Sequence, residues 1–92
     1  MRLRLTRPAA RQLARVLDTI AQEHPPGARK VQERIARVME LLLQYPHLGH
    51  ETERPGVRRF VASPYPYALT YSATDSEIII LGVRHTSRRP LA

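Results

Sequence analysis

The sequence contains no cysteine, so it can form neither a disulfide framework nor a thiolate metal site. It has no run of about 18 apolar residues, which argues against a transmembrane helix. The basic residues 1–4 are not followed by the apolar stretch and cleavage site of a signal peptide. A glycine-rich phosphate loop, a G-x-S-x-G motif and an H-E-x-x-H motif are also absent. These absences predict a cytoplasmic protein, and we expect no cofactor.

A metal site is not expected either. His47 and His50 have H-x-x-H spacing, but no acidic or sulfur ligand lies at a matching distance in the sequence. They are predicted to be solvated histidines in a polar loop that covers residues 47–56.

Acidic residues are few. Fifteen Lys and Arg against eight Asp and Glu give a net charge of +7, and fourteen of the fifteen cations are arginine. Such an excess favours polyanions or an acidic protein partner. The alternative is that the arginines reflect codon composition and solvate the surface. Only their placement in the fold can decide between these two interpretations.

The first half predicts a strand and two helices. Residues 2–6 alternate as in a half-buried strand, Thr6 suits a helix N-cap, and Pro8 is tolerated in a first turn. The apolar positions that follow have helical spacing: Leu13, Val16, Leu17 and Ile20. Residues 25–27, Pro-Pro-Gly, should end this helix. A second apolar stripe then predicts a second helix: Val31, Ile35, Val38, Leu42 and Tyr45.

Such a short break between two helices predicts an antiparallel hairpin. Leu41 and Leu43 lie outside the second stripe. Either the C-terminal turn of the second helix is buried on all sides, or the two leucines form a docking surface for a partner.

The second half predicts three strands, over residues 57–63, 67–72 and 77–83. In the second of these strands the large residues Tyr67, Leu69 and Tyr71 should face the helices. Ala68, Thr70 and Ser72 should face away, onto an open concave face fringed with arginine. The last strand, EIIILGV, fits a central strand that is buried on both faces.

The fold class predicted is therefore α+β with the order β-α-α-β-β-β. One domain, residues 1–92, places the helical hairpin on one face of a small, mainly antiparallel sheet.

Most polar candidates for chemistry lie in the second half: Glu51, Glu53, Arg58, Arg59, Tyr71, Arg84, His85, Arg88 and Arg89. Arg58 and Arg59 should point to opposite faces of their strand, so at most one of them joins a given site. His85 with a neighbouring arginine has the groups for general acid catalysis and phosphate binding in RNA cleavage. The alternative is that His85 ends a strand and hydrogen-bonds backbone.

Taken in order, several segments resemble the ParE/RelE toxin superfamily of bacterial toxin–antitoxin modules. The matching segments are L-Q-Y-P-H-L-G at residues 43–49, P-G-V-R-R at 55–59, Y-A-L-T-Y at 67–71 and I-L-G-V-R-H-T-S-R-R-P at 80–90. The resemblance implies a small toxin that a cognate antitoxin neutralises with an acidic, apolar C-terminal segment. A basic domain with an open face suits such a partner. We expect the antitoxin to contact Leu41, Leu43, Ala68 and Thr70.

The superfamily divides by mechanism. Members similar to RelE cleave ribosome-bound mRNA and usually carry arginine after the first tyrosine of the Y-x-x-x-Y segment, where this chain has Ala68. A methyl group cannot stabilise charge developing on a phosphate. The ending of residues 85–90 resembles ParE members instead, which inhibit DNA gyrase without catalysing a reaction. This resemblance implies a non-enzymatic gyrase inhibitor with these target contacts: Arg58, Arg84, His85, Arg88 and Arg89.

Two other functions stay open. The first is a ribosome-dependent endoribonuclease with His85 as acid or base, Arg58 and Arg88 as phosphate clamps, and Tyr71 in support. The second, weaker one is a basic module that binds nucleic acid without cleaving it. The sequence offers that module neither a recognition helix with base-reading side chains nor many aromatic residues for stacking.

Overall fold

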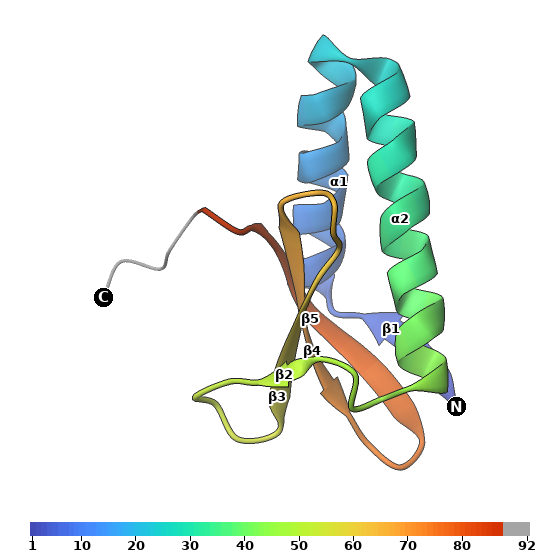
Figure 1. Ribbon diagram of the computed structural model, residues 1–92, viewed down its shortest axis with the longest axis vertical. Helices are drawn as coiled ribbons and strands as arrows, with labels where there is room; N and C mark the ends of the chain where they lie inside the picture. The colour runs from blue at the N-terminus through green and yellow to red at the C-terminus, as the bar shows by residue number, and fades with distance from the viewer. Residues whose placement is uncertain (88–92) are drawn as a thin grey trace.

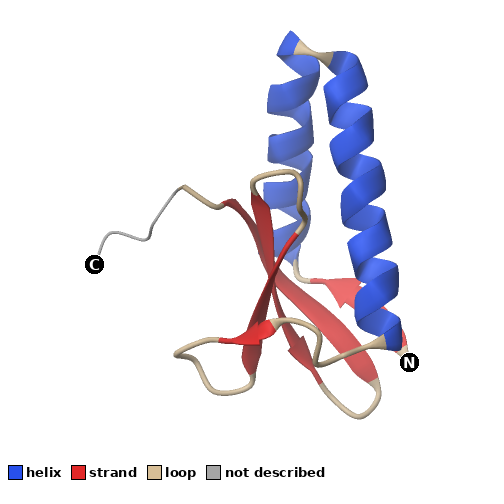
Figure 2. Cartoon of the chain, in the orientation of Figure 1, coloured by secondary structure: helices blue, strands red, loops and turns tan. Residues whose placement is uncertain are grey.

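A computed structural model describes residues 1–87 of the chain. Two helices pack against a five-stranded, mostly antiparallel sheet, which confirms the α+β fold class (Figures 1 and 2). The elements in chain order are β1 (Arg2–Leu5), α1 (Arg7–Glu23), α2 (Pro25–Gln44), β2 (His50–Glu51), β3 (Val57–Val61), β4 (Tyr67–Ala73) and β5 (Glu77–His85). None of the helices within residues 1–87 is long and apolar enough to span a membrane.

The helical hairpin forms as predicted, but the prediction that residues 25–27 make the break is wrong, because Pro25, Pro26 and Gly27 form the first turn of α2. Thr6 is the N-cap of α1, and its hydroxyl accepts a hydrogen bond from the Ala9 amide at 3.2 Å. Only His24 separates the two helices, because Pro25 already opens α2. Proline ends the first helix and suits the start of the second, where its missing N–H would have no helical partner. The closed end of this hairpin projects beyond the sheet (Figure 1).

The apolar stripe of α2 is confirmed over most of its length. Val31, Ile35, Val38 and Leu42 are buried. The prediction is wrong for Tyr45, which is 60% exposed. The helix ends at Gln44, and Tyr45 as C-cap has left the helical backbone conformation, with φ −131° and ψ 79°. Its side chain therefore no longer follows the periodicity that placed it on the stripe.

The sheet has the strand order β1-β5-β4-β3-β2. β1 runs parallel to β5, and every other neighbouring pair is antiparallel. The short strand β2 was not predicted, because its two residues lie in a polar loop and show no apolar alternation. It pairs with β3 through His50 opposite Arg59 and Glu51 opposite Arg58.

A bulge in β5 decides which side chains of that strand reach the core. Thr70 of β4 lies opposite Gly82, whereas the next residue, Tyr71, lies opposite Ile80, so Leu81 is the additional residue. The core cluster accordingly contains the β5 side chains Ile78, Ile80 and Val83. The prediction that β5 is buried on both faces is only half right, since Ile79 and Leu81 are half-buried and lie outside that cluster.

Two faces of the sheet follow from this register, because cross-strand neighbours share a face. We call the side toward the core the inner face; its members include Leu69, Tyr71, Ile78, Ile80 and Val83. The outer face is the opposite side of β3, β4 and β5: Val57, Arg59, Val61, Ala68, Thr70, Ser72, Ile79, Leu81, Gly82 and Arg84. As predicted, Tyr67, Leu69 and Tyr71 belong to the core side.

Gln12 of α1 completes the hydrogen bonding of β5 beyond the end of β1. The Thr6 amide donates to Ile80 O at 3.0 Å, after which the chain turns into the helix. In the next part of β5 Gln12 provides the hydrogen-bond acceptor, because its Oε1 accepts from the Val83 amide at 2.8 Å. Gln12 thereby fixes the strand segment that carries Arg84 and His85.

Replacing Gln12 by alanine is expected to destabilise the fold by about 1 kcal/mol, because the part-buried Val83 amide loses its acceptor. Urea unfolding should show a lower midpoint with an unchanged slope. The matched control is Gln22→Ala, at an exposed position of the same helix. Equal midpoints for the two variants would contradict this role of Gln12.

Candidate functional site

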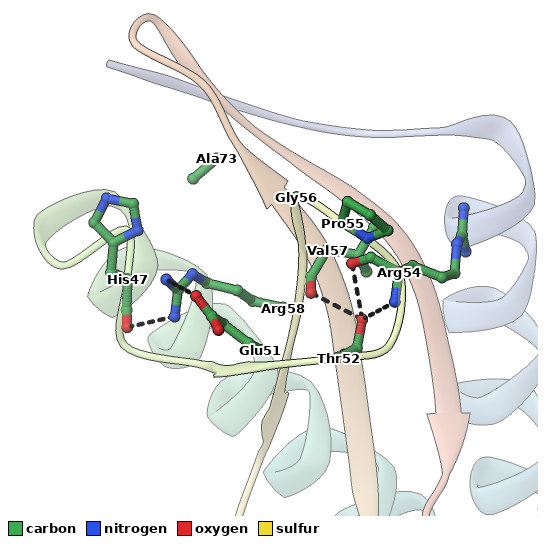
Figure 3. A pocket seen from close by; sticks show the side chains of 9 residues that line it. All are labelled: His47, Glu51, Thr52, Arg54, Pro55, Gly56, Val57, Arg58 and Ala73. Carbon is green, nitrogen blue, oxygen red and sulfur yellow. Dashed lines mark hydrogen bonds and ion pairs between the residues drawn. The ribbon is translucent and has the colours of Figure 1, made fainter.

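Tyr71 and Arg58 are cross-strand neighbours on the inner face and together hold the loop that follows α2. The Tyr71 hydroxyl accepts from the Gly49 amide at 2.8 Å and donates to Pro46 O at 2.9 Å. Arg58 Nη1 donates to Gly49 O at 2.8 Å. It also donates to His47 O at 3.3 Å (Figure 3). Both side chains therefore use their polar atoms to order the backbone of residues 46–49.

The electrostatics of this pair suit a structural role. Burial raises the pKa of the Tyr71 phenol, although the hydrogen bond from Gly49 and the charge of Arg58 act in the opposite direction. The phenol is therefore neutral at physiological pH and able to donate to Pro46. Arg58 also forms an ion pair with Glu51 at 3.4 Å. Since the Glu51 side chain is 83% exposed, this pair contributes little stability.

The same loop borders a pocket of about 280 Å³. Its lining is mainly polar and comes from the loop, β3 and the end of β4 (Figure 3): His47, Glu51, Thr52, Arg54, Pro55, Gly56, Val57, Arg58 and Ala73. The turn on one side of it is closed by Thr52, whose hydroxyl donates to Val57 O at 2.9 Å. Residues 1–87 contain no cluster of three acidic, cysteine or histidine side chains placed to hold a metal ion.

His85 lies at the other end of β4, beside Tyr67. The two rings meet edge to face, with centroids 5.4 Å apart and planes at 88°. His85 Nδ1 accepts from the Ser87 amide at 3.2 Å and contacts the Ser87 hydroxyl at 2.7 Å. This arrangement matches the alternative in which the histidine ends a strand and hydrogen-bonds backbone.

The side chains proposed for RNA cleavage are thus not assembled into one site. Tyr71 pairs with Arg58 across the sheet, whereas His85 pairs with Tyr67. Tyr67 and Tyr71 are four residues apart on one strand, which separates them by about 13 Å. The remaining candidate, Arg88, lies outside the described residues, as does Arg89. Neither of these arginines is placed here.

Arg58 and Arg59 do point to opposite faces, as predicted. Arg58 is half-buried on the inner face, while Arg59 is exposed and lies opposite Thr70 on the outer face. Arg84 is exposed and lies opposite Ala68, also on the outer face. The predicted target contacts Arg58 and Arg84 therefore lie on opposite faces of the sheet. Arg59 is the residue that sequence reasoning missed, because the bulge at Leu81 sets which arginine lies on the same side as Arg84.

The residues expected to contact an antitoxin differ in their exposure. Leu41, Leu43 and Thr70 are half-buried, and Leu43 packs against the core. The expectation of an open surface is wrong for Ala68, which is 4% exposed. Its methyl group lies between two larger cross-strand neighbours, Val61 and Arg84.

Comparison with known proteins decides the family. Residues 3–90 match the family described as "ParE toxin of type II toxin-antitoxin system, parDE". The chain belongs to the ParE toxin family. The match runs through Arg88 and Arg89, so it includes the basic C-terminal segment singled out in the sequence. The chain is thus a toxin of the ParE kind, from a type II toxin–antitoxin system.

A solved structure supports the same assignment to the ParE family. The chain is similar to "Chromosomal ParDE TA system from P. aeruginosa", with a TM-score of 0.83 and 28% sequence identity. The similarity covers 95% of this chain and 97% of the other. No curated protein matches the sequence.

Proposed function

We propose that this ParE family toxin inhibits DNA gyrase through protein contacts, without catalysing a reaction, and that a cognate antitoxin neutralises it. The observation that carries the proposal is the match to the ParE family over residues 3–90. The side-chain geometry points the same way. An endoribonuclease needs its acid, base and phosphate-binding groups within hydrogen-bond reach of one scissile phosphate. Here Arg58 and Tyr71 hydrogen-bond the backbone of residues 46–49, whereas His85 lies at the opposite end of β4.

For the contact with gyrase we propose Arg84 and His85 at the end of β5, together with Arg88 and Arg89. Arg59 joins this set, because it is exposed on the same face as Arg84. Arg58 now contributes indirectly, by ordering the loop after α2. Within residues 1–87 neither Arg59 nor Arg84 forms an ion pair, so both guanidinium groups are available to an acidic partner.

The test is to titrate the purified toxin, freed of antitoxin, into gyrase supercoiling and ribosomal translation assays side by side. We expect supercoiling to be inhibited while translation continues. Arg84→Ala should raise the toxin concentration needed for half inhibition at least ~10-fold, the loss typical of a charged contact at an interface. Arg15→Ala, which removes an equally exposed arginine from α1, is the matched control. Translation arrest with cleaved mRNA would refute the gyrase proposal and favour the endoribonuclease.

A further inference from the structure

The exposed side of α1 carries three arginines in a row. Arg7, Arg11 and Arg15 follow one another at intervals of four residues, so they share one side of the helix over about 12 Å. We call them the arginine row, and all three are exposed. Ala9 and Leu13 place the opposite side of α1 against the core. The arginine row is therefore turned away from the core, toward solvent.

The positive charge of the arginine row is not compensated by neighbouring residues. Within residues 1–87 none of its guanidinium groups forms an ion pair. On α2, by contrast, Arg37 pairs with Glu40 at 3.0 Å. The first acidic residue of α1 is Asp18, about one turn beyond Arg15, and it forms no ion pair within the described residues.

The arginine row acts against the stability of its own helix. Like charges four residues apart repel each other, and positive charge near a helix N-terminus opposes the helix dipole. Arg7 is the first residue of α1, and the first turn of this helix contains no acidic residue. Neither helix formation nor core packing accounts for these three positions, which suggests that an anion outside the chain compensates their charge.

The surroundings of the arginine row favour one kind of polyanion. Its exposed neighbours on the helix include Ala10 and Ala14, whose small side chains let a phosphate backbone come close. A membrane surface or an amphipathic protein segment would need large apolar side chains at these positions. One strand of duplex DNA presents a phosphate about every 3.4 Å along the axis, so the row spans about three or four phosphates.

We propose that the arginine row binds the phosphate backbone of duplex nucleic acid without reading its sequence. Each guanidinium group donates hydrogen bonds to the oxygens of a phosphate. Such binding needs neither the base-reading side chains nor the stacking aromatic residues that the sequence does not offer. It adds a second partner surface to the toxin, on α1.

This binding does not depend on gyrase. The core lies between the arginine row and the outer face of the sheet, which carries Arg59 and Arg84. The two surfaces are therefore separate and can be tested independently. Arg15→Ala stays a valid control in the gyrase assay, because Arg15 lies outside the contact proposed for gyrase.

Binding is measured by the fluorescence anisotropy of a labelled 20-base-pair DNA duplex between about 50 and 200 mM salt. The test variant is Arg7→Gln/Arg11→Gln/Arg15→Gln. We expect it to weaken binding at least ~10-fold at the lowest salt concentration. The slope of log K against log salt concentration should fall in magnitude by about 3, since each lost phosphate contact releases about one counterion fewer.

The matched control removes the same charge from exposed positions outside α1: Arg29→Gln/Lys30→Gln/Arg54→Gln. It should change the affinity less than ~3-fold, because salt screens charges that do not contact the duplex. Equal losses of affinity in the two variants would overturn the proposal, since binding would then depend on net charge alone. A salt slope that the test variant leaves unchanged would overturn it as well.

Urea unfolding distinguishes a lost contact from a damaged fold. Glutamine has nearly the helix propensity of arginine and removes the repulsion within the row. The test variant should therefore unfold at a midpoint no lower than that of the parent chain. Weaker binding together with a lower midpoint would mean that the arginines support the fold, which contradicts a binding role.

Other ligands test the phosphate contact itself. Two DNA duplexes of unrelated sequence should bind within ~3-fold of each other, and a larger difference would refute binding through the backbone alone. An RNA duplex that binds with the same salt slope supports the phosphate contact, and its affinity relative to DNA identifies the preferred nucleic acid. Tighter binding of a 20-residue polyglutamate peptide would assign the row to an acidic protein instead. A toxin that binds the duplex but never inhibits gyrase refutes only the proposed function.

Discussion

Replacing Tyr71 by phenylalanine is expected to lower the free energy of unfolding by about 1–3 kcal/mol, the usual cost of leaving a buried donor without a partner. The hydroxyl is the acceptor for the buried Gly49 amide and the donor to Pro46 O, so the substitution removes two hydrogen bonds of one loop. In a domain of this size each kcal/mol lowers Tm by roughly 4–8 °C. Hydrogen exchange should locate the effect, since the Gly49 amide loses its protection.

The pH dependence of stability provides a second readout for Tyr71. Burial raises the pKa of the Tyr71 phenol in the folded state above its unfolded pKa of ~10. At pH values between these two pKa values, the folded chain therefore binds more protons than the unfolded chain. The stability that the neutral phenol contributes is therefore fully present below pH ~10. It is lost as the pH rises through the pKa of the folded state. The Phe variant should lose this alkaline component.

Tyr45→Phe is the control for Tyr71→Phe. Tyr45 is 60% exposed, so removing its hydroxyl leaves no buried group unpaired, and Tm should stay unchanged. If Tyr71→Phe unfolds at the same temperature as Tyr45→Phe, the loop does not depend on the tyrosine hydroxyl.

Gly49→Ala is expected to cost about 1–3 kcal/mol, as overpacking of a tight site usually does. The added Cβ would lie 2.8 Å from both Cε1 and the hydroxyl oxygen of Tyr71 and 2.9 Å from Arg59 O. One of these neighbours is backbone in the sheet, so the loop has to move. That movement breaks the Tyr71 and Arg58 bonds together, which denaturant unfolding measures as a lower midpoint.

A double-variant cycle separates this mechanism from general loop damage. Gly49→Ala and Tyr71→Phe act on the same contact, so their combined cost should fall short of the sum by at least ~0.5 kcal/mol. Gly56→Ala is the matched control in the neighbouring turn. Its penalty comes from a positive φ of 76° with no atom within 4 Å of the added Cβ, so it should add independently to Tyr71→Phe. Full additivity in both pairs would contradict the contact at Gly49.

Much of the fold is predictable because its signals are local. Thr6, Pro8 and the proline pair at residues 25 and 26 mark helix ends through capping and missing N–H groups. The stripe from Val31 to Leu42 follows from helical spacing alone. Helical spacing fails for Tyr45, because the helix ends at Gln44. No local pattern predicts β2, because its two polar residues form a strand only through their pairing with β3.

The candidate site divides in the same way. The sequence by itself determined the family resemblance, the excess of arginine and the opposite orientations of Arg58 and Arg59, since each depends only on residue order and strand alternation. The tertiary structure alone decided that Tyr71 and Arg58 hold a loop, that Ala68 is buried, and that Arg59 shares a face with Arg84. The physical reason is the register between strands. One additional residue, Leu81, changes which side chains of β5 share a face, and no local pattern in the chain specifies that shift.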